Sequence, residues 1–207
     1  MRVYHFLSPE YGLKDLKEKR LKISEAMSLN DPFEFLGVDL SCKETRKKIK
    51  NLKQKSSKYF GLICFSKNWN SPVQWAHYAN KHQGICLGFE IPDKRLKKVK
   101  YVDKKPFLSS TMTDDEFRKL FLTKFSHWSY EEEYRMFLNL TEQEDGFYYE
   151  NFSEVMILKQ VIIGVKSSIT KKNVQDAFGD EKIEIFRVRC AFKSFSMVRN
   201  RATDSII

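Results

Sequence analysis

Three apolar runs of strand length constrain the fold of this chain more than any other feature. They are GLICFS (61–66), ICLGFEI (85–91) and EVMILKQVIIGV (154–165), and glycines or polar turn residues flank them. Short apolar runs with such boundaries are typical of buried β-strands. Each run is also much shorter than the ~20 apolar residues that a membrane-spanning helix requires. The runs therefore predict a sheet-based core and no membrane span.

Three helices are predicted from their boundary residues. TDDEFRKLFLTKF (113–125) begins with acidic residues behind a capping threonine. SPVQWAHYANKHQG (71–84) offers Ser71 as N-cap, Pro72 at the first helical position and Gly84 as its end. SITKKNVQDAFG (168–179) is typical of a shorter capped helix that ends at its glycine. Strand-length segments outnumber the helices and do not alternate regularly with them, which favours an α+β fold with two small, strongly bent sheets. Further strand-length segments are VYHFLS (3–8), which we expect to be buried, KKVKYV (97–102), which fits an exposed strand, EEYRMFLNL (132–140) and KIEIFRVRCAF (182–192).

The composition predicts one folded domain over residues 1–207. The 207 residues are 42% apolar and include 17 phenylalanines, which is enough for one substantial core. The four cysteines lie far apart and form no C-x-x-C pair, so we expect neither disulfides nor a structural zinc site. The first residues contain no apolar run of signal-peptide length, and we expect a reducing, cytoplasmic location.

The net charge of +10 is concentrated in one segment. KETRKKIKNLKQKSSK, from Lys43 to Lys58, carries eight basic residues and one acidic residue, which leaves +3 for the rest of the chain. We expect an exposed, mainly helical insertion, attached through one narrow apolar face by Ile49 and Leu52. Its lysines can bind nucleic-acid phosphates, or they can form a solvated face that keeps the protein soluble. The segment contains no aromatic residue, which disfavours binding of single-stranded nucleic acid.

The segment SHWSYEEEYRMF (126–137) contains three successive carboxylates followed by an arginine. If YEEEYRMF is a strand, side-chain alternation places Glu131, Glu133 and Arg135 on one face and Glu132 on the other. The two carboxylates on the first face would then lie about 7 Å apart. Such a pair suits acid–base or electrostatic catalysis. The alternative is a structural ion pair between Glu133 and Arg135 within a solvated acidic corner.

Several common kinds of site are absent from the sequence. The chain has no G-x-G-x-x-G loop, no phosphate-binding loop that ends in Gly-Lys-Ser or Gly-Lys-Thr, and no H-E-x-x-H motif. His77 and His82 are five residues apart, so on a helix they would diverge by roughly 140° and form a poor metal pair. We therefore expect no metal site.

Three motifs in the sequence resemble those of a known bacterial family. They are SLNDPFE (28–34), CFSKNWNSPVQWAHYANKHQGICLGFEI (64–91) and K-x-x-x-W-x-Y-E-x-E-x-R from Lys124 to Arg135. Together they resemble the family catalogued as domain of unknown function 2971, over about residues 3 to 165. The layout is similar to ADP-ribosyltransferase-like folds, which implies split or bent, antiparallel-rich sheets with peripheral helices. VYHFLS is similar to the opening strand of some DNA-modifying ADP-ribosyltransferase toxins, although many family members carry a Lys-Tyr pair in that strand.

The resemblance implies an enzyme that uses NAD as its substrate. Such an enzyme cleaves the nicotinamide–ribose bond and transfers ADP-ribose to a nucleic acid or a protein, as some toxins and antiphage effectors do. Glu133 would hold the ribose 2′-hydroxyl and stabilise the positive charge that develops on the ribose. Glu131 would orient or deprotonate the acceptor. Arg135 would fix Glu133 or bind a phosphate.

The same resemblance assigns five residues to the cofactor side of the site. His5 would hydrogen-bond the adenosine ribose or the amide of NAD, and Tyr78 would stack on the nicotinamide ring. Tyr4, Trp75 and Asn30 complete this group. Two other functions stay open: a non-catalytic nucleotide- or nucleic-acid-binding module, and a nuclease-like toxin in which His5 and Glu133 serve as acid and base.

Overall fold

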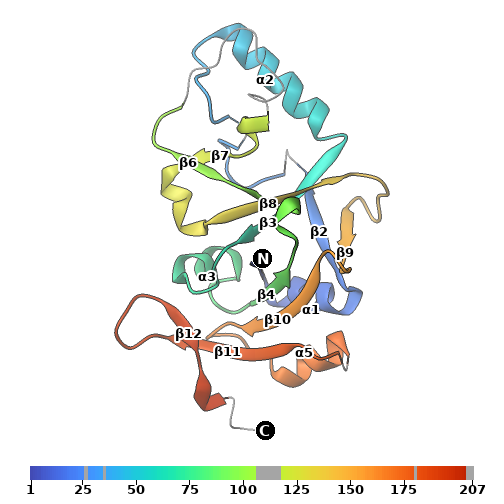
Figure 1. Cartoon of the computed structure of the whole chain (residues 1–207), viewed down its shortest axis with the longest axis vertical. Coiled ribbons are helices and arrows are strands. Elements are labelled where there is room, and N and C mark those ends of the chain that lie inside the picture. The colour runs from blue at the N-terminus through green and yellow to red at the C-terminus, as the bar shows by residue number, and fades with distance from the viewer. Residues whose placement is uncertain (26–27, 35, 106–117, 180, 204–207) are drawn as a thin grey trace. The chain divides into compact units, whose positions relative to one another are not determined.

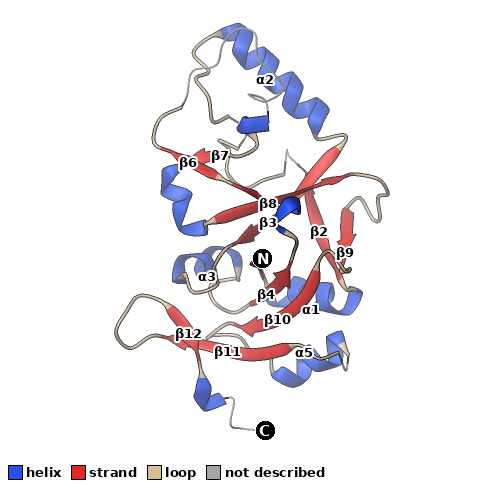
Figure 2. Ribbon diagram, viewed as in Figure 1, coloured by secondary structure: helices blue, strands red, loops and turns tan. Residues whose placement is uncertain are grey.

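The three apolar runs form strands in the computed structural model of the chain (Figures 1 and 2). GLICFS lies in β3 (Phe60–Ser66), ICLGFEI in β4 (Ile85–Glu90) and the third run in β10 (Ile157–Ile163). Most strand pairs are antiparallel and the helices are few, which confirms the predicted α+β class. The structure describes residues 1–207 except 26–27, 35, 106–117, 180 and 204–207.

The described residues fall into two compact units, although the sequence predicted one domain. Unit 1 contains Met1–Leu21, Phe65–Asp93 and Glu150–Ile207, and unit 2 contains Lys22–Cys64 and Lys94–Tyr149. The chain therefore passes between the units four times. Neither unit is one continuous stretch of sequence, so sequence position alone does not separate them.

Unit 1 contains a sheet in which the strands lie in the order β12, β11, β10, β4 and β1. β4 has antiparallel neighbours on both sides and exposes only its last residue, which explains its continuous apolar sequence. β1 is less buried than predicted, because only Val3 in it is fully buried. Beyond β4 and β10, the elements of unit 1 are β1 (Arg2–Leu7), α1 (Pro9–Glu18), α3 (Pro72–Tyr78), α5 (Lys171–Phe178), β11 (Glu184–Cys190), β12 (Met197–Arg199) and the 3-10 helix η3 (Arg201–Thr203).

Two of the three helices predicted from capping residues begin where expected, and the predicted start of the third, at Thr113, lies outside the described residues. The Ser71 hydroxyl accepts a hydrogen bond from the backbone N–H of Gln74 at the start of α3. Thr170 and Asn173 form a reciprocal capping box at the start of α5. α5 ends at Gly179 as predicted, with a φ of 88° at the glycine. Capping chemistry is local, so the sequence is sufficient to place these starts.

The end of α3 differs from the prediction. The helix stops at Tyr78, and the residues at 80, 81 and 82 follow with positive φ values of 43°, 55° and 70°. Gly84 lies beside β1, where an added Cβ would be 1.9 Å from the carbonyl oxygen of Leu7. This glycine is thus required for close backbone approach and does not end the helix.

Unit 2 is built around the N-terminal part of β3. There β2 (Arg20–Glu25) pairs antiparallel with β3, with Ser24 opposite Leu62. β8 (Glu133–Asn139) pairs with β3 and with β5 (Lys97–Lys98). β6 (Lys100–Val102) and β7 (Thr123–Phe125) form a separate parallel pair. The other elements are α2 (Lys43–Ser56) and the 3-10 helix η2 (Ser126–Glu131) in unit 2, and η1 (Asp93–Arg95) and β9 (Tyr148–Asn151), which contain residues of both units.

The predicted basic insertion is largely the helix α2, and its attachment is narrow. Ile49 is 2% exposed and packs with Val38 and Leu120. Leu52, expected on the same face, is only half-buried. Lys53 adds a polar anchor, because its Nζ donates a hydrogen bond to the carbonyl oxygen of Glu34 at 3.1 Å. Most other basic side chains of α2 are exposed, as expected for an exposed insertion, and this exposure fits phosphate binding as well as a solvated face.

Ile49→Ala should lower the free energy of unfolding by about 2–4 kcal/mol, because it removes the central apolar contact of α2. Lys50→Ala, at the neighbouring exposed position, should change it by less than about 0.5 kcal/mol. Urea denaturation of both variants measures the difference. Equally small effects would show that α2 is not attached through Ile49.

Candidate functional site

The YEEEYRMF segment is a helix end followed by a strand, and the prediction of one continuous strand is wrong. Glu131 ends η2, Glu132 adopts a left-handed conformation with φ of 44°, and β8 begins at Glu133. The predicted separation of the side chains nevertheless holds. Glu131 and Glu133 are 5% and 4% exposed, whereas Glu132 is exposed. The left-handed turn, and not strand alternation, brings the two buried carboxylates to the same side.

Lys124 joins the two buried carboxylates. Its Nζ lies 2.6 Å from Oε2 of Glu131 and 3.2 Å from Oε2 of Glu133. It also lies 3.4 Å from Oε1 of Glu34 and over the ring of Trp128, 4.9 Å from the centroid. Four residues that carried the family resemblance are thus in contact around one ammonium group.

Arg135 occupies the other side of Glu133. Its Nε lies 2.6 Å from Oε1 of Glu133 and its Nη2 lies 3.1 Å from Oε2. Nη2 also donates to Oε1 of Glu34 at 2.7 Å, and Nη1 donates to the carbonyl oxygen of Phe121 at 2.8 Å. The guanidinium is fully buried. We call Glu34, Lys124, Glu131, Glu133 and Arg135 the buried ion cluster.

The charges of the buried ion cluster stabilise one another. Burial alone would raise the pKa of Glu133, but the Arg135 guanidinium and the Lys124 ammonium outweigh it and lower that pKa to about 2. Burial alone would lower the pKa of Lys124, and the neighbouring carboxylates raise it above its ordinary value instead. The ammonium of Lys53 lies near Glu34. With Lys124 and Arg135 it makes three cations beside the three carboxylates. Glu133 is therefore ionised at neutral pH.

This geometry is that of a structural ion-pair network. Both carboxylate oxygens of Glu133 accept hydrogen bonds from Arg135, so a ribose hydroxyl would have to displace one of them. Tyr101 also contacts Glu133, because its hydroxyl accepts a hydrogen bond from the backbone N–H of Glu133 at 2.9 Å. Among the described residues, Oε2 of Glu34 is the cluster atom that is buried without a hydrogen-bond partner. The catalytic roles of Glu131, Glu133 and Arg135 stay predictions.

A small hollow borders the cluster within unit 2. Lys124 lines it together with Phe33, Gly37, Lys105 and Phe125. Its volume is about 260 Å³. Small-molecule sites usually measure about 300–1,000 Å³. This hollow is therefore smaller than a dinucleotide site is expected to be.

The residues predicted for the cofactor side lie in both units. Tyr4, His5, Trp75 and Tyr78 belong to unit 1, whereas Asn30 is an exposed residue of unit 2, as is the ion cluster. Within the predicted set, the structure brings Glu131, Glu133 and Arg135 into one cluster.

The four residues of unit 1 that were predicted for the cofactor side have different surroundings. Trp75 is fully buried, donates its indole N–H to the carbonyl oxygen of Trp69 at 2.6 Å, and packs edge-on against Phe6. A buried indole offers no surface for a ligand, so Trp75 has the environment of a core residue. His5 and Tyr78 are partly exposed, and Tyr4 lines a hollow.

We call this hollow the Tyr4 cavity. Its volume is about 540 Å³. Tyr4 donates a hydrogen bond to Oε1 of Gln160 at 3.4 Å and accepts one from the indole of Trp69. Burial is the main cause that raises the pKa of Tyr4 above its ordinary value, so the phenol is neutral at pH 7. The cavity is lined by Arg2, Tyr4, Lys67, Asn68, Trp69, Asn70, Met197, Val198 and Arg199.

Sequence reasoning named Tyr4 but missed its cationic neighbours. Arg2 is held by Glu90 at 2.8 Å, and Arg199 pairs with Glu184 and lies over the ring of Phe186. Arg2 could have been found, because strand alternation places it on the same face as Tyr4. Arg199 could not, because its place depends on how β12 returns along β11.

Comparison with known proteins does not identify the chain: no family model, no curated protein and no solved structure matches it. In the part of the chain that the structure describes, no helix is long and apolar enough to cross a membrane. The same residues include no group of three or more His, Cys, Asp or Glu side chains placed to hold a metal ion.

Glu133→Gln should lower the free energy of unfolding by about 3–5 kcal/mol, because it leaves the buried Arg135 guanidinium without its main counter-charge. Glu132→Gln, one residue away and exposed, should change it by less than about 0.5 kcal/mol. Chemical denaturation at pH 7 compares the two variants. Similar effects of both substitutions would contradict the structural role of the cluster.

Stability should fall with decreasing pH in a way that depends on Glu133. Its folded pKa is about 2, below the unfolded value of about 4.3, so the unfolded state binds the proton first as the pH falls. The contribution of Glu133, about 3 kcal/mol, should be complete above about pH 4.5 and should disappear as the pH falls to about 2. Denaturation of the wild type and Glu133→Gln across this range should show a steeper dependence in the wild type. Parallel curves would refute the assignment.

Proposed function

We propose that this chain binds a nucleotide in the Tyr4 cavity. The observation that carries the proposal is the combination of Tyr4 and Trp69 with the cations Arg2, Lys67 and Arg199 around one hollow of about 540 Å³. Aromatic rings suit the face of a nucleobase. Arginine and lysine side chains suit phosphate oxygens. The volume lies within the usual range of about 300–1,000 Å³ for small-molecule sites.

The cationic side chains are already oriented before a ligand arrives. Glu90 and Glu184 hold the guanidinium groups of Arg2 and Arg199 by one ion pair each. A guanidinium has five N–H donors in a planar fork and can bind a carboxylate and a phosphate together. The buried Nε of Arg2 has no hydrogen-bond partner among the described residues. Because this nitrogen is buried, phosphate contacts from Arg2 would come from its terminal N–H groups.

ADP-ribosyl transfer from NAD is the second candidate. The family resemblance implies it, and the Tyr4 cavity supports its binding step because Tyr4 is one of the predicted cofactor residues. The bond-breaking step needs a carboxylate at the ribose. Glu133, the predicted carboxylate, is engaged by Arg135 and Lys124. The geometry therefore favours nucleotide binding over turnover.

Calorimetric titration with AMP, ATP and NAD should detect binding to the wild type. Arg199→Ala and Lys67→Ala should each weaken it by about tenfold or more, because each removes a charge-assisted contact to phosphate. Arg95→Ala, an exposed arginine outside the cavity, is the control and should leave affinity unchanged.

The two candidates are separated by an assay of nicotinamide release from NAD. Release by the wild type, lost in Glu133→Gln variants that remain folded, would establish ADP-ribosyl transfer or NAD hydrolysis. Binding without release would leave a nucleotide-binding module. If none of the three nucleotides binds, both candidates are wrong.

A further inference from the structure

Two phenylalanine rings project into solvent from the loop between β11 and β12. Phe192 is 88% exposed and Phe195 is 102% exposed. The loop does not need them to close, because the backbone N–H of Ala191 donates to the carbonyl oxygen of Ser196. These two rings gain no free energy from burial in the fold, and exposed apolar patches of this kind mark binding surfaces.

The same hairpin is strongly basic. Residues 185–203 contain five basic residues and no acidic one. Arg187 belongs to the fold, because it donates to the carbonyl oxygens of residues 164, 167 and 169. The other four are Arg189, Lys193, Arg199 and Arg201, and all of them line a hollow of about 760 Å³. Aromatic and cationic groups are thus combined on one short segment.

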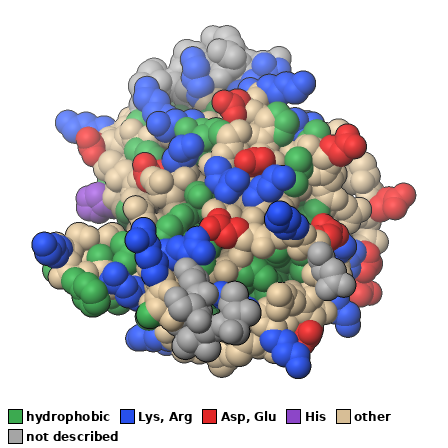
Figure 3. All heavy atoms as spheres, turned by 60° about the horizontal axis from the view of Figure 1, so that its bottom comes forward, with side chains coloured by type: hydrophobic (Ala, Val, Ile, Leu, Met, Phe, Trp, Pro, Cys, Tyr) green, Lys and Arg blue, Asp and Glu red, His purple; other side chains and the backbone are tan. Residues whose placement is uncertain are grey.

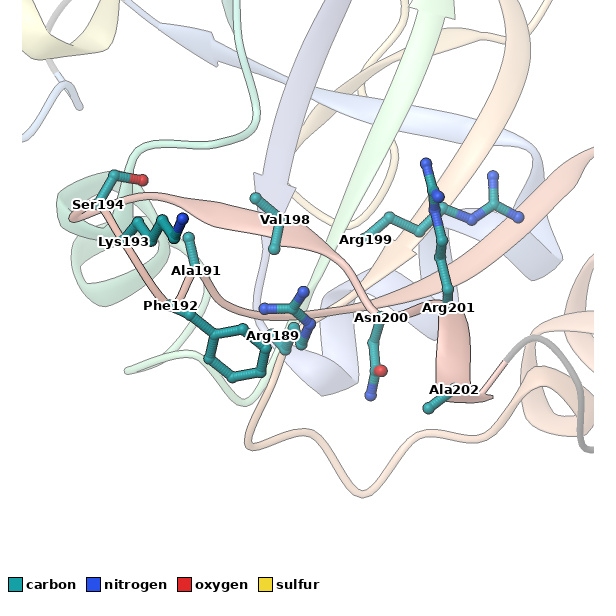
Figure 4. A pocket seen from close by; sticks show the side chains of 10 residues that line it. All are labelled: Arg189, Ala191, Phe192, Lys193, Ser194, Val198, Arg199, Asn200, Arg201 and Ala202. Atoms are coloured by element: carbon teal, nitrogen blue, oxygen red, sulfur yellow. The ribbon is translucent and has the colours of Figure 1, made fainter.

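The close view of this hollow shows how the side chains lie. The ring of Phe192 lies beside Arg189, and Arg199 and Arg201 project together from the other side (Figure 4). The guanidinium carbon of Arg189 is 4.2 Å from the centroid of the Phe192 ring. This cation–π contact holds one face of the ring and leaves the other for a planar ligand. Figure 3, turned so that this end comes forward, shows Lys and Arg side chains beside projecting hydrophobic ones.

We propose that this surface binds single-stranded nucleic acid, and we call it the hairpin surface (Arg189, Phe192, Lys193, Phe195, Arg199 and Arg201). Exposed aromatic rings stack on unpaired bases, which a duplex does not offer. The interleaved cations then contact the backbone phosphates. This combination is what α2 lacks, since the basic segment 43–58 contains no aromatic residue.

A lipid surface fits the hairpin less well. Membrane-binding segments present a continuous apolar face with the cations at its margin. Here the exposed polar residues Lys193 and Ser194 separate the two rings, and the cations line a hollow. A flexible polyanion with bases along its length can follow such a hollow.

The hairpin surface adjoins the Tyr4 cavity. Val198 and Arg199 line both hollows. The backbone N–H of Met197 donates to the carbonyl oxygen of Asn70, which ties β12 to the loop that lines the cavity. A strand bound along the hairpin surface would therefore bring its neighbouring nucleotide to the Tyr4 cavity. This inference goes beyond the proposed function, because it rests on the rings and cations of the hairpin and needs no free nucleotide to bind.

Fluorescence anisotropy with a labelled 20-nucleotide single strand, as DNA and as RNA, tests the proposal. The single strand should bind at least about tenfold more tightly than the same sequence annealed into a duplex. The logarithm of the association constant should fall with the logarithm of salt concentration with a slope of about −2 to −3, as for three or four phosphate contacts.

Variants then assign the binding to the hairpin surface. Phe192→Ala with Phe195→Ala should weaken single-strand binding by about tenfold for each ring that stacks on a base. Lys193→Glu with Arg201→Glu should weaken it further and flatten the salt dependence. Lys172→Glu with Lys182→Glu makes the same charge change at exposed positions of unit 1 and should leave binding within about twofold. Circular dichroism and thermal unfolding confirm that each variant is folded.

Several outcomes would overturn the proposal. Equal binding of single strand and duplex, lost in Lys47→Glu with Lys50→Glu but not in the hairpin variants, would assign nucleic-acid binding to α2. Binding to phosphatidylcholine–phosphatidylglycerol vesicles without binding to oligonucleotides would identify a lipid-binding surface. If the protein binds neither vesicles nor oligonucleotides, the proposal is wrong. AMP titration of the double phenylalanine variant tests the Tyr4 cavity separately. AMP affinity should be unchanged, because Phe192 and Phe195 do not line that cavity.

Discussion

The buried guanidinium of Arg135 is the group on which the organisation of unit 2 depends. A fully buried cation is stable only when opposite charges and acceptors surround it. Arg135 meets this requirement with Glu133 in its own strand, Glu34 in the SLNDPFE turn and the carbonyl oxygen of Phe121. Lys124 repeats the arrangement from β7. The SLNDPFE turn, β7, η2 and β8 are thus held together by charged groups that none of these elements could bury alone.

Local chemistry explains most of what the sequence could predict. Continuous apolar runs identified β3, β4 and β10, and side-chain caps identified the starts of α3 and α5, because both signals lie within a few neighbouring residues. The errors came from distant partners. The end of α3 depends on the approach of Gly84 to Leu7, and the turn at Glu132 serves a cluster whose member Glu34 is 101 residues from Arg135. Local periodicity contains no information about such contacts.

The charged residues and Trp75 of the three sequence motifs largely serve the fold. Trp75 packs in the core of unit 1, and Glu34, Lys124, Glu131, Glu133 and Arg135 hold unit 2 together. The exposed chemistry lies in the Tyr4 cavity, to which the start of the 64–91 motif contributes residues 67–70, and on the hairpin surface, which lies beyond about residue 165. A motif of charged residues can therefore serve the fold, and the exposed groups suited to binding lie in the Tyr4 cavity and on the hairpin surface.

The alternation of the chain between the two units has a consequence for its synthesis. β4 pairs with β1 on one side, but its other neighbour, β10, begins at Ile157, more than sixty residues later. At a translation rate of about 5–20 residues per second, several seconds pass between the synthesis of β4 and that of β10. During this time the backbone groups of β4 that later pair with β10 have no strand partner. β4 is among the most apolar strands of the protein, and such an unpaired edge is a template for pairing with other chains. Nascent chains that stop before Ile157 should therefore be the species that chaperones need to shield.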